Sequence, residues 1–96
     1  MKKNEAEVLY VKLASTSKDV QRFNTKIGQG IRSVRESLGF SQRALAEKAK
    51  FCRNTLVQIE LGQRKTPISL KTVYKLLDAL VVPITLDEFL ELCRLT

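Results

Sequence analysis

The chain has 96 residues, which is enough for one small domain but not for two separate hydrophobic cores. Apolar residues make up 44% and charged residues 28%, which argues against a disordered or collagen-like chain. The formal charge is +7 and histidine is absent, so imidazole catalysis and histidine metal sites are excluded.

The two cysteines, Cys52 and Cys93, fit no CxxC or zinc-ligand spacing. No apolar run approaches the roughly 18 residues that a membrane span requires. The basic start is soon interrupted by Glu5 and Glu7, which makes it a poor signal peptide. We therefore predict a cytoplasmic protein with reduced thiols, no catalytic residues, no metal or cofactor, no small-molecule ligand and no membrane partner.

The positive charge is concentrated in the middle of the chain. Residues 22–75 hold twelve basic against three acidic residues, a net charge of +9, whereas residues 76–96 have a net charge of −3. Such a local excess favours an anion-binding surface, above all for nucleic acid. The alternative is a solvated surface that happens to be basic.

In chain order, residues 1–23 are expected to form an N-terminal extension, in which Val8–Leu13 fits a strand and residues 17–23 could lead into the first helix. A first helix is predicted over residues 24–38, capped by Asn24 or Thr25 and ended by Gly39. Its apolar residues recur at helical spacing: Ile27, Ile31, Val34 and Leu38.

Two short helices follow within the helix-turn-helix domain expected over residues 24–80. Ser41 caps the first of them, and the second covers residues 53–61 and is closed by Gly62. Pro67 ends a polar loop, and Ser69 caps a fourth helix. Residues 81–96 are expected to form a short extended segment and a last helix, which opens with a capping box at Thr85–Glu88.

The two short helices and their tight turn make a helix-turn-helix candidate. At about 100° per residue, Leu56 and Ile59 of the second helix point one way. The opposite face carries side chains that match base edges in the major groove: Arg53, Asn54, Val57 and Gln58. The alternative is an ordinary surface helix, because such residues are common on surfaces.

Several short motifs between Ile27 and Leu80 form a recognisable pattern: Ile31-Arg32, Arg35-Glu36, Leu38-Gly39-Phe40-Ser41-Gln42, Leu45-Ala46, Thr55-Leu56 and Ile59-Glu60-Leu61-Gly62. This pattern resembles the Cro/lambda-repressor, or xenobiotic-response-element, family of helix-turn-helix regulators. The resemblance implies an all-α, lambda-repressor-like domain of five helices. Short extended segments at either end would be free to pair across a dimer.

The resemblance also assigns roles to individual residues. Arg53, Asn54 and Gln58 match base-reading positions, and Arg35 and Glu60 match an ion pair between the first and third helices. Residues expected near DNA phosphates are Gln42, Arg43, Lys50, Thr55, Arg64 and Lys65. The sequence departs from the pattern at three positions: Lys50 stands where glycine is usual, Cys52 replaces a Ser or Asp cap, and Leu61 is exposed where polar residues are common.

We therefore predict a sequence-specific transcriptional regulator that binds double-stranded DNA as a homodimer on a pseudo-palindromic operator and represses its own operon. The expected dimer surface contains Val82, Ile84, Leu86 and Phe89, and the alternative for these residues is a core within one chain. Residues 66–86 also resemble antitoxins that partner HipA-type kinase toxins, so a toxin-binding protein is the rival hypothesis. Controllers of restriction–modification operons and phage repressors are further members of the same family. RNA binding is less favoured because aromatic residues are scarce.

Overall fold

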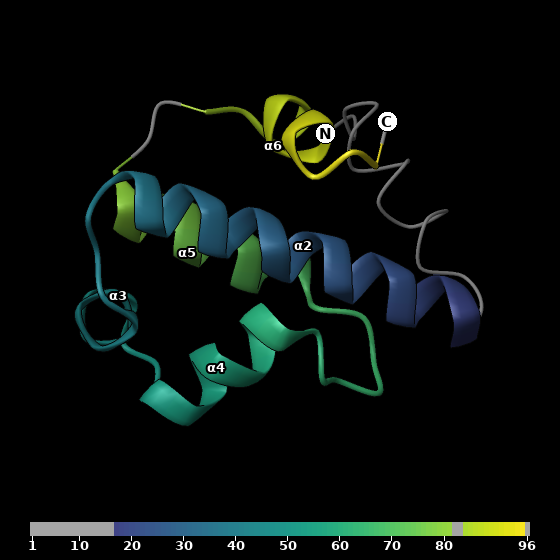
Figure 1. The fold of residues 1–96 in the computed structure, drawn as a ribbon, viewed down its shortest axis with the longest axis horizontal. Coiled ribbons are helices and arrows are strands. Elements are labelled where there is room, and N and C mark those ends of the chain that lie inside the picture. The colour runs from purple at the N-terminus through teal and green to yellow at the C-terminus, as the bar shows by residue number, and fades with distance from the viewer. Residues whose placement is uncertain (1–16, 82–83, 96) are drawn as a thin grey trace.

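The computed structural model describes residues 17–81 and 84–95, and within these ranges it contains five α-helices and no strand. They are α2 (Ser17–Ser37), α3 (Gln42–Ala49), α4 (Arg53–Leu61), α5 (Leu70–Leu80) and α6 (Leu86–Leu92) (Figure 1). The predicted all-α, five-helix fold is confirmed. The strand expected at residues 8–13 lies outside the described residues, as does part of the expected extended segment at 81–84. Among the helices that are described, none combines the length and the apolarity needed to cross a membrane.

The long helix α2 begins at Ser17, so the predicted start at Asn24 is wrong. Val20 and Phe23 extend the apolar stripe by two more turns, and Phe23 is almost fully buried. Asn24 is buried too, with its side chain bonded to another part of the chain, so it does not act as a cap. At the other end, Gly39 stops the helix with a φ of 77°, as expected, but Leu38 lies beyond the last turn and is exposed.

The starts of α3, α5 and α6 follow local capping rules. The side chains of Ser41, Ser69 and Thr85 each accept a hydrogen bond from the backbone of their own first turn. Thr85 and Glu88 form the predicted capping box. These short helices therefore begin where the sequence places them.

Helix α2 runs through the middle of the molecule, with α4 on one side of it and α6 on the other (Figure 1). It contacts α4, α5 and α6, while α3 packs on α4 and α5. The core between these helices is formed by residues from all five of them, including Phe23, Ile31, Leu45, Leu56, Val73, Leu76 and Phe89. Burial of these side chains is the main source of stability for such a domain.

Two glycines allow α2 to approach its neighbours closely. A Cβ atom on Gly28 would overlap the carbonyl oxygen of Ile59 and lie 2.7 Å from that of Glu60. A Cβ atom on Gly30 would overlap Sγ of Cys93 and lie 3.2 Å from Cζ of Phe89. The backbone of α2 therefore touches α4 directly at one point and α6 side chains at another.

Candidate nucleic-acid interface

The turn between α3 and α4 is tight because Lys50 adopts a left-handed conformation, with φ 61° and ψ 41°. Its backbone N–H bonds back to α3, and the N–H of Phe51 donates to the carbonyl of Ala46 at 2.9 Å. Lysine thus occupies a position that favours glycine, at a cost of about 1–2 kcal/mol. The gain is a cation at the start of α4.

Helix α4 is divided into an inner and an outer face. Leu56, Ile59 and Glu60 are buried on the inner face. The residues expected to read bases point outward: Arg53, Asn54 and Gln58 are exposed, and Val57 is half-buried. Their contact with DNA remains a prediction, but no core function competes for the three exposed side chains.

The first turn of α4 lacks the usual side-chain cap. Cys52 takes the cap position, but its side chain makes no capping hydrogen bond. Its Sγ lies instead 3.0 Å from Oγ1 of Thr55, and this hydrogen bond lowers the pKa of the exposed Cys52 thiol. Thr55, which was expected near a phosphate, is half-buried and hydrogen-bonded to Cys52.

The ion pair expected between Arg35 and Glu60 is present and buried. Nε and Nη2 of Arg35 donate to the two carboxylate oxygens of Glu60 at 2.7 and 3.0 Å. The side chains are only 9% and 2% exposed. The hydrogen bond to Glu60 raises the pKa of Arg35, against the opposing effect of burial. Nη1 also donates to the carbonyl of Phe40 at 2.7 Å, so Arg35 holds both α4 and the link to α3.

Two further residues expected at phosphates make contacts within the chain. Nε2 of Gln42 donates to Glu60 at 3.1 Å, which ties the start of α3 to the buried ion pair. An amide nitrogen carries two hydrogens, so this bond leaves the other one for a phosphate. Arg43 pairs with Glu47 at 3.3 Å on the open surface, an interaction weak enough to be exchanged for a phosphate.

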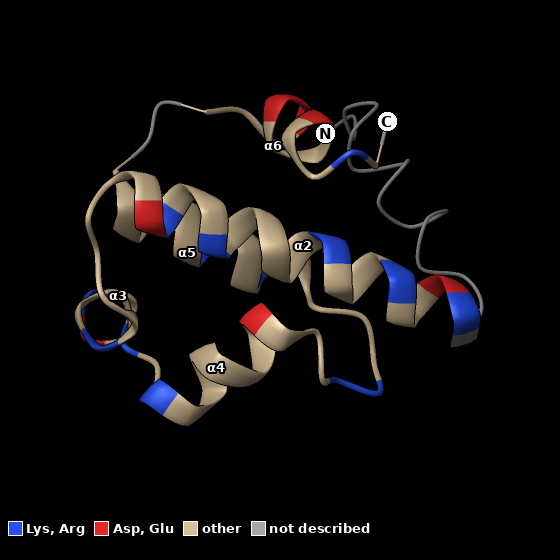
Figure 2. Cartoon of the chain, viewed as in Figure 1, with Lys and Arg blue, Asp and Glu red and all other residues tan. Residues whose placement is uncertain are grey.

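Basic residues lie at both ends of α4. Lys50 and Arg53 are at its start, and Arg64 and Lys65 follow its end in the α4–α5 loop (Figure 2). The acidic residues of α6 lie on the other side of α2 (Figure 2). The charge segregation along the sequence is therefore also a segregation in space, and the surface around α4 is suited to a polyanion.

The sequence did not reveal the role of Asn24. Its Nδ2 donates to the carbonyl oxygens of Arg64 at 3.3 Å and Thr66 at 2.8 Å, and its Oδ1 accepts from the N–H of Ile68 at 2.9 Å. The α4–α5 loop therefore rests on α2 through one side chain. The apolar spacing of Val20 and Phe23, which shows that the helix begins earlier, was the available signal that Asn24 is not a cap.

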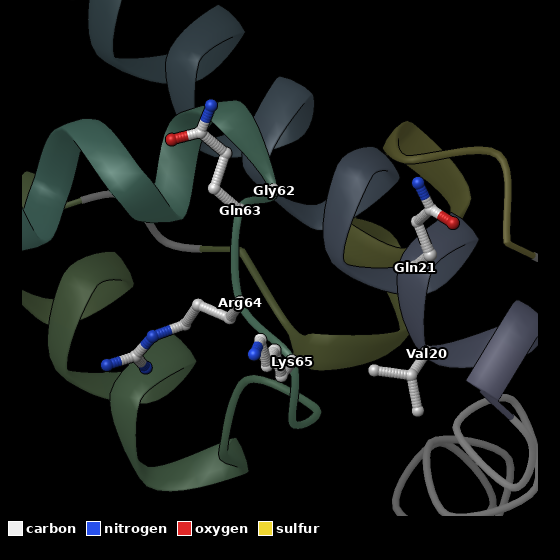
Figure 3. Close-up of a pocket in the computed structure, with 6 residues that line it drawn as sticks. All are labelled: Val20, Gln21, Gly62, Gln63, Arg64 and Lys65. Carbon is white, nitrogen blue, oxygen red and sulfur yellow. The ribbon is translucent and has the colours of Figure 1, made fainter.

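Beside this loop is an open hollow of about 330 Å³. Val20 and Gln21 line it from α2, and Gly62–Lys65 line it from the loop (Figure 3). It lies next to two cations expected at DNA phosphates, so it belongs to the same basic surface.

The residues expected at a dimer surface fall into different environments. Leu86 and Phe89 are buried in the core of their own chain, in line with the alternative interpretation, and Ile84 is half-buried against that core. Val82 lies outside the described residues. Exposed apolar side chains nearby are Val81, 71% exposed, and Leu92, 50% exposed.

The tight turn, the outward polar face of α4 and the basic residues at its ends define a DNA-binding helix-turn-helix protein. A helix-turn-helix family model matches residues 31–86, and the chain belongs to this Cro/C1-type family. The chain is also similar to the crystal structure of the restriction-modification controller protein C.AhdI from Aeromonas hydrophila. The two are 35% identical with a TM-score of 0.59, over 69% of this chain and 94% of that one. A search of curated proteins finds no match. The family match and the similarity to a controller protein show that the protein is a DNA-binding transcriptional regulator.

Proposed function

We propose that the protein is a dimeric repressor of its own operon that binds a pseudo-palindromic operator in the manner of a controller protein. The observation that carries the proposal is the outer face of α4, where Arg53, Asn54 and Gln58 are exposed beside the half-buried Val57. Arginine matches guanine, and asparagine or glutamine matches adenine, in the major groove. Because the target is duplex DNA, we propose that the protein acts in the cytoplasm.

The phosphate contacts of this proposal surround α4. Gln42 and Arg43 are at the start of α3, Lys50 is in the turn, and Arg64 and Lys65 are in the following loop. Two such units related by a two-fold axis would read half-sites about 34 Å apart, one helical turn of DNA. Val81 and Leu92 supply exposed apolar surface for that pairing.

Control of a restriction–modification operon is the form of autoregulation that we favour. It is supported by the 35% identity to a restriction-modification controller protein over most of that chain. The rival, a HipA-type antitoxin whose main partner is a toxin, has no such support. A kinase-like toxin gene beside this one, together with failure to select any DNA sequence, would favour that rival.

The test is selection of bound sequences from a random duplex pool at a stated salt concentration. An inverted repeat is expected, and its recovery would support both DNA reading and two-fold symmetry. On the selected site, Arg53→Ala is expected to cost about 1–3 kcal/mol and to relax the preference at one base. Unchanged binding and sequence preference in Arg53→Ala would refute the assigned reading face.

A matched pair of charge removals tests the phosphate contacts. Lys65→Ala should weaken binding to all sequences alike and flatten the dependence of log K on log salt by about one. Arg94→Gly is the control, since it removes the same charge beyond α6 and suits the φ of 59° at that position. An equal change in both variants would show that net charge, and not the α4–α5 loop, sets the salt dependence.

A further inference from the structure

The α4–α5 loop carries two of the proposed phosphate-binding residues, yet it has no regular secondary structure of its own. A loop of this kind is normally free to move, and ordering it on binding costs conformational entropy. The structure holds it in place through α2. The anchor is Asn24, which is only 3% exposed and lies on the α2 turn beside the loop.

Asn24 holds the backbone on both sides of Lys65. Its Nδ2 donates to the carbonyl oxygen of the residue before, Arg64, and to that of the residue after, Thr66. Its Oδ1 accepts from the N–H of Ile68, where the loop enters the core. One amide group therefore fixes three points of the loop, and Lys65 lies between two of them.

A second contact fixes the other end of the loop on the same turn of α2. Gly62 ends α4 in a left-handed conformation, with φ 69°. A Cβ atom there would lie 2.8 Å from Cα and 2.9 Å from the backbone nitrogen of Thr25. The loop thus leaves α4 against Thr25 and is then held by Asn24, while the side chain of Arg64 points away from α2 (Figure 3).

We propose that Asn24 is a positioning residue for DNA binding. Asn24 does not touch DNA, because it is buried beneath the loop. It sets the backbone from which Arg64 and Lys65 reach the phosphates that flank the groove occupied by α4. This inference rests on the proposed function, and it predicts that replacement of Asn24 weakens the phosphate binding of other residues.

The test measures the salt dependence of binding for the full chain on a duplex of about 30 base pairs of arbitrary sequence, from about 50 to about 200 mM salt. Binding to such a duplex depends on its phosphates alone. Asn24→Ala should flatten the slope of log K against log salt by about 0.9 for each phosphate that is no longer neutralised, and thus by about 1.8 if neither Arg64 nor Lys65 reaches its phosphate. In an Arg64→Ala/Lys65→Ala background, Asn24→Ala should have no further effect on the slope.

Two further variants separate positioning from general stability. Asn24→Asp keeps an acceptor for the N–H of Ile68 but cannot donate to the loop carbonyls, so its slope should fall as in Asn24→Ala. Ala79→Gly destabilises the last turn of α5, where Ala79 is buried, through helix propensity and leaves the hydrogen bonds of the loop intact. Its melting temperature should fall while its salt slope stays that of the unaltered chain.

The outcomes are distinguishable. The positioning role is refuted if Asn24→Ala and Asn24→Asp keep the full salt slope at temperatures below their melting points. It is also refuted if these substitutions lower the slope as much in the Arg64→Ala/Lys65→Ala background as they do in the unaltered chain. If Lys65→Ala itself leaves the slope unchanged, the phosphate contacts of the loop are refuted, and this inference with them. If the unaltered chain fails to bind the duplex, the proposed function is overturned first.

Discussion

Removal of the Glu60 carboxylate should be among the most damaging single changes to this fold. Glu60→Ala deletes the acceptor of two hydrogen bonds from Arg35 and one from Gln42. The Arg35 side chain is 9% exposed and would keep only its bond to the carbonyl of Phe40. An unpaired charge left in such a place typically costs about 3–5 kcal/mol. For a domain of this size that corresponds to a fall in melting temperature of at least about 12 °C, at about 4 °C per kcal/mol.

Urea unfolding followed by circular dichroism measures this cost, with a double variant to isolate the pair. Arg35→Met/Glu60→Leu replaces both charges by apolar side chains of similar size, which is often neutral or even stabilising. The double variant should therefore be more stable than Glu60→Ala. A cycle closed with the single variants Arg35→Met and Glu60→Leu should give a coupling free energy of about 2 kcal/mol or more.

The surface pair of Arg32 and Glu36 is the control. Its nitrogen and oxygen are 2.9 Å apart, close to the distances in the buried pair, but its side chains are 60% and 55% exposed. Glu36→Ala should cost less than about 1 kcal/mol because water screens the charges. If Glu60→Ala lowers the free energy of unfolding no more than Glu36→Ala does, burial does not strengthen the contribution of the Arg35–Glu60 pair, and the reasoning is refuted.

Three further predictions concern the turn, the α2–α4 contact and the thiols. Lys50→Gly should raise the free energy of unfolding by about 1 kcal/mol, because it relieves a φ of 61°, and should flatten the salt slope of DNA binding by about one. Unchanged or lower stability in urea would contradict this. Gly28→Ala should lower the melting temperature because its methyl group would overlap the α4 backbone. This is expected although alanine is the better helix former by about 1 kcal/mol. A higher melting temperature would show that the helices can separate. Iodoacetamide should modify Cys52 with a midpoint below pH 9.0, since a lowered pKa gives thiolate at lower pH. Burial raises the pKa of Cys93 to about 12, so mass spectrometry should find it unmodified until the chain is unfolded.

The sequence predicted the helix-turn-helix well because its signals are local. Ser41 marks a helix start through its side-chain hydroxyl, and Gly62 marks a helix end through its left-handed backbone. The outer face of α4 follows from helical periodicity alone. Arg35 and Glu60 are 25 residues apart in the sequence, and their ion pair was expected only from the family resemblance. Helical periodicity identifies the buried stripe of the first helix, but it cannot name the partner of Arg35.

The errors arise where a residue type has two common uses. Asparagine near a helix start is a good cap, and the structure uses Asn24 instead for tertiary hydrogen bonds inside a longer helix. Similarly, the spacing of Leu86 and Phe89 identifies a buried face but not what buries it, and their own chain does so here. Tertiary contacts decide such cases, and the local patterns of a single sequence do not show which distant residues come into contact.

The direct contact between α4 and Gly28 of α2 also bears on how this regulator can evolve. The backbones of the two helices are in direct contact there, so the distance between α4 and α2 does not depend on the side chains of the outer face of α4. Arg53, Asn54 and Gln58 are exposed and can be exchanged without repacking the core. Under the proposed function, a few substitutions at these positions would redirect the protein to a new DNA sequence on an unchanged scaffold. That would be a short evolutionary route to related regulators that do not interfere with one another.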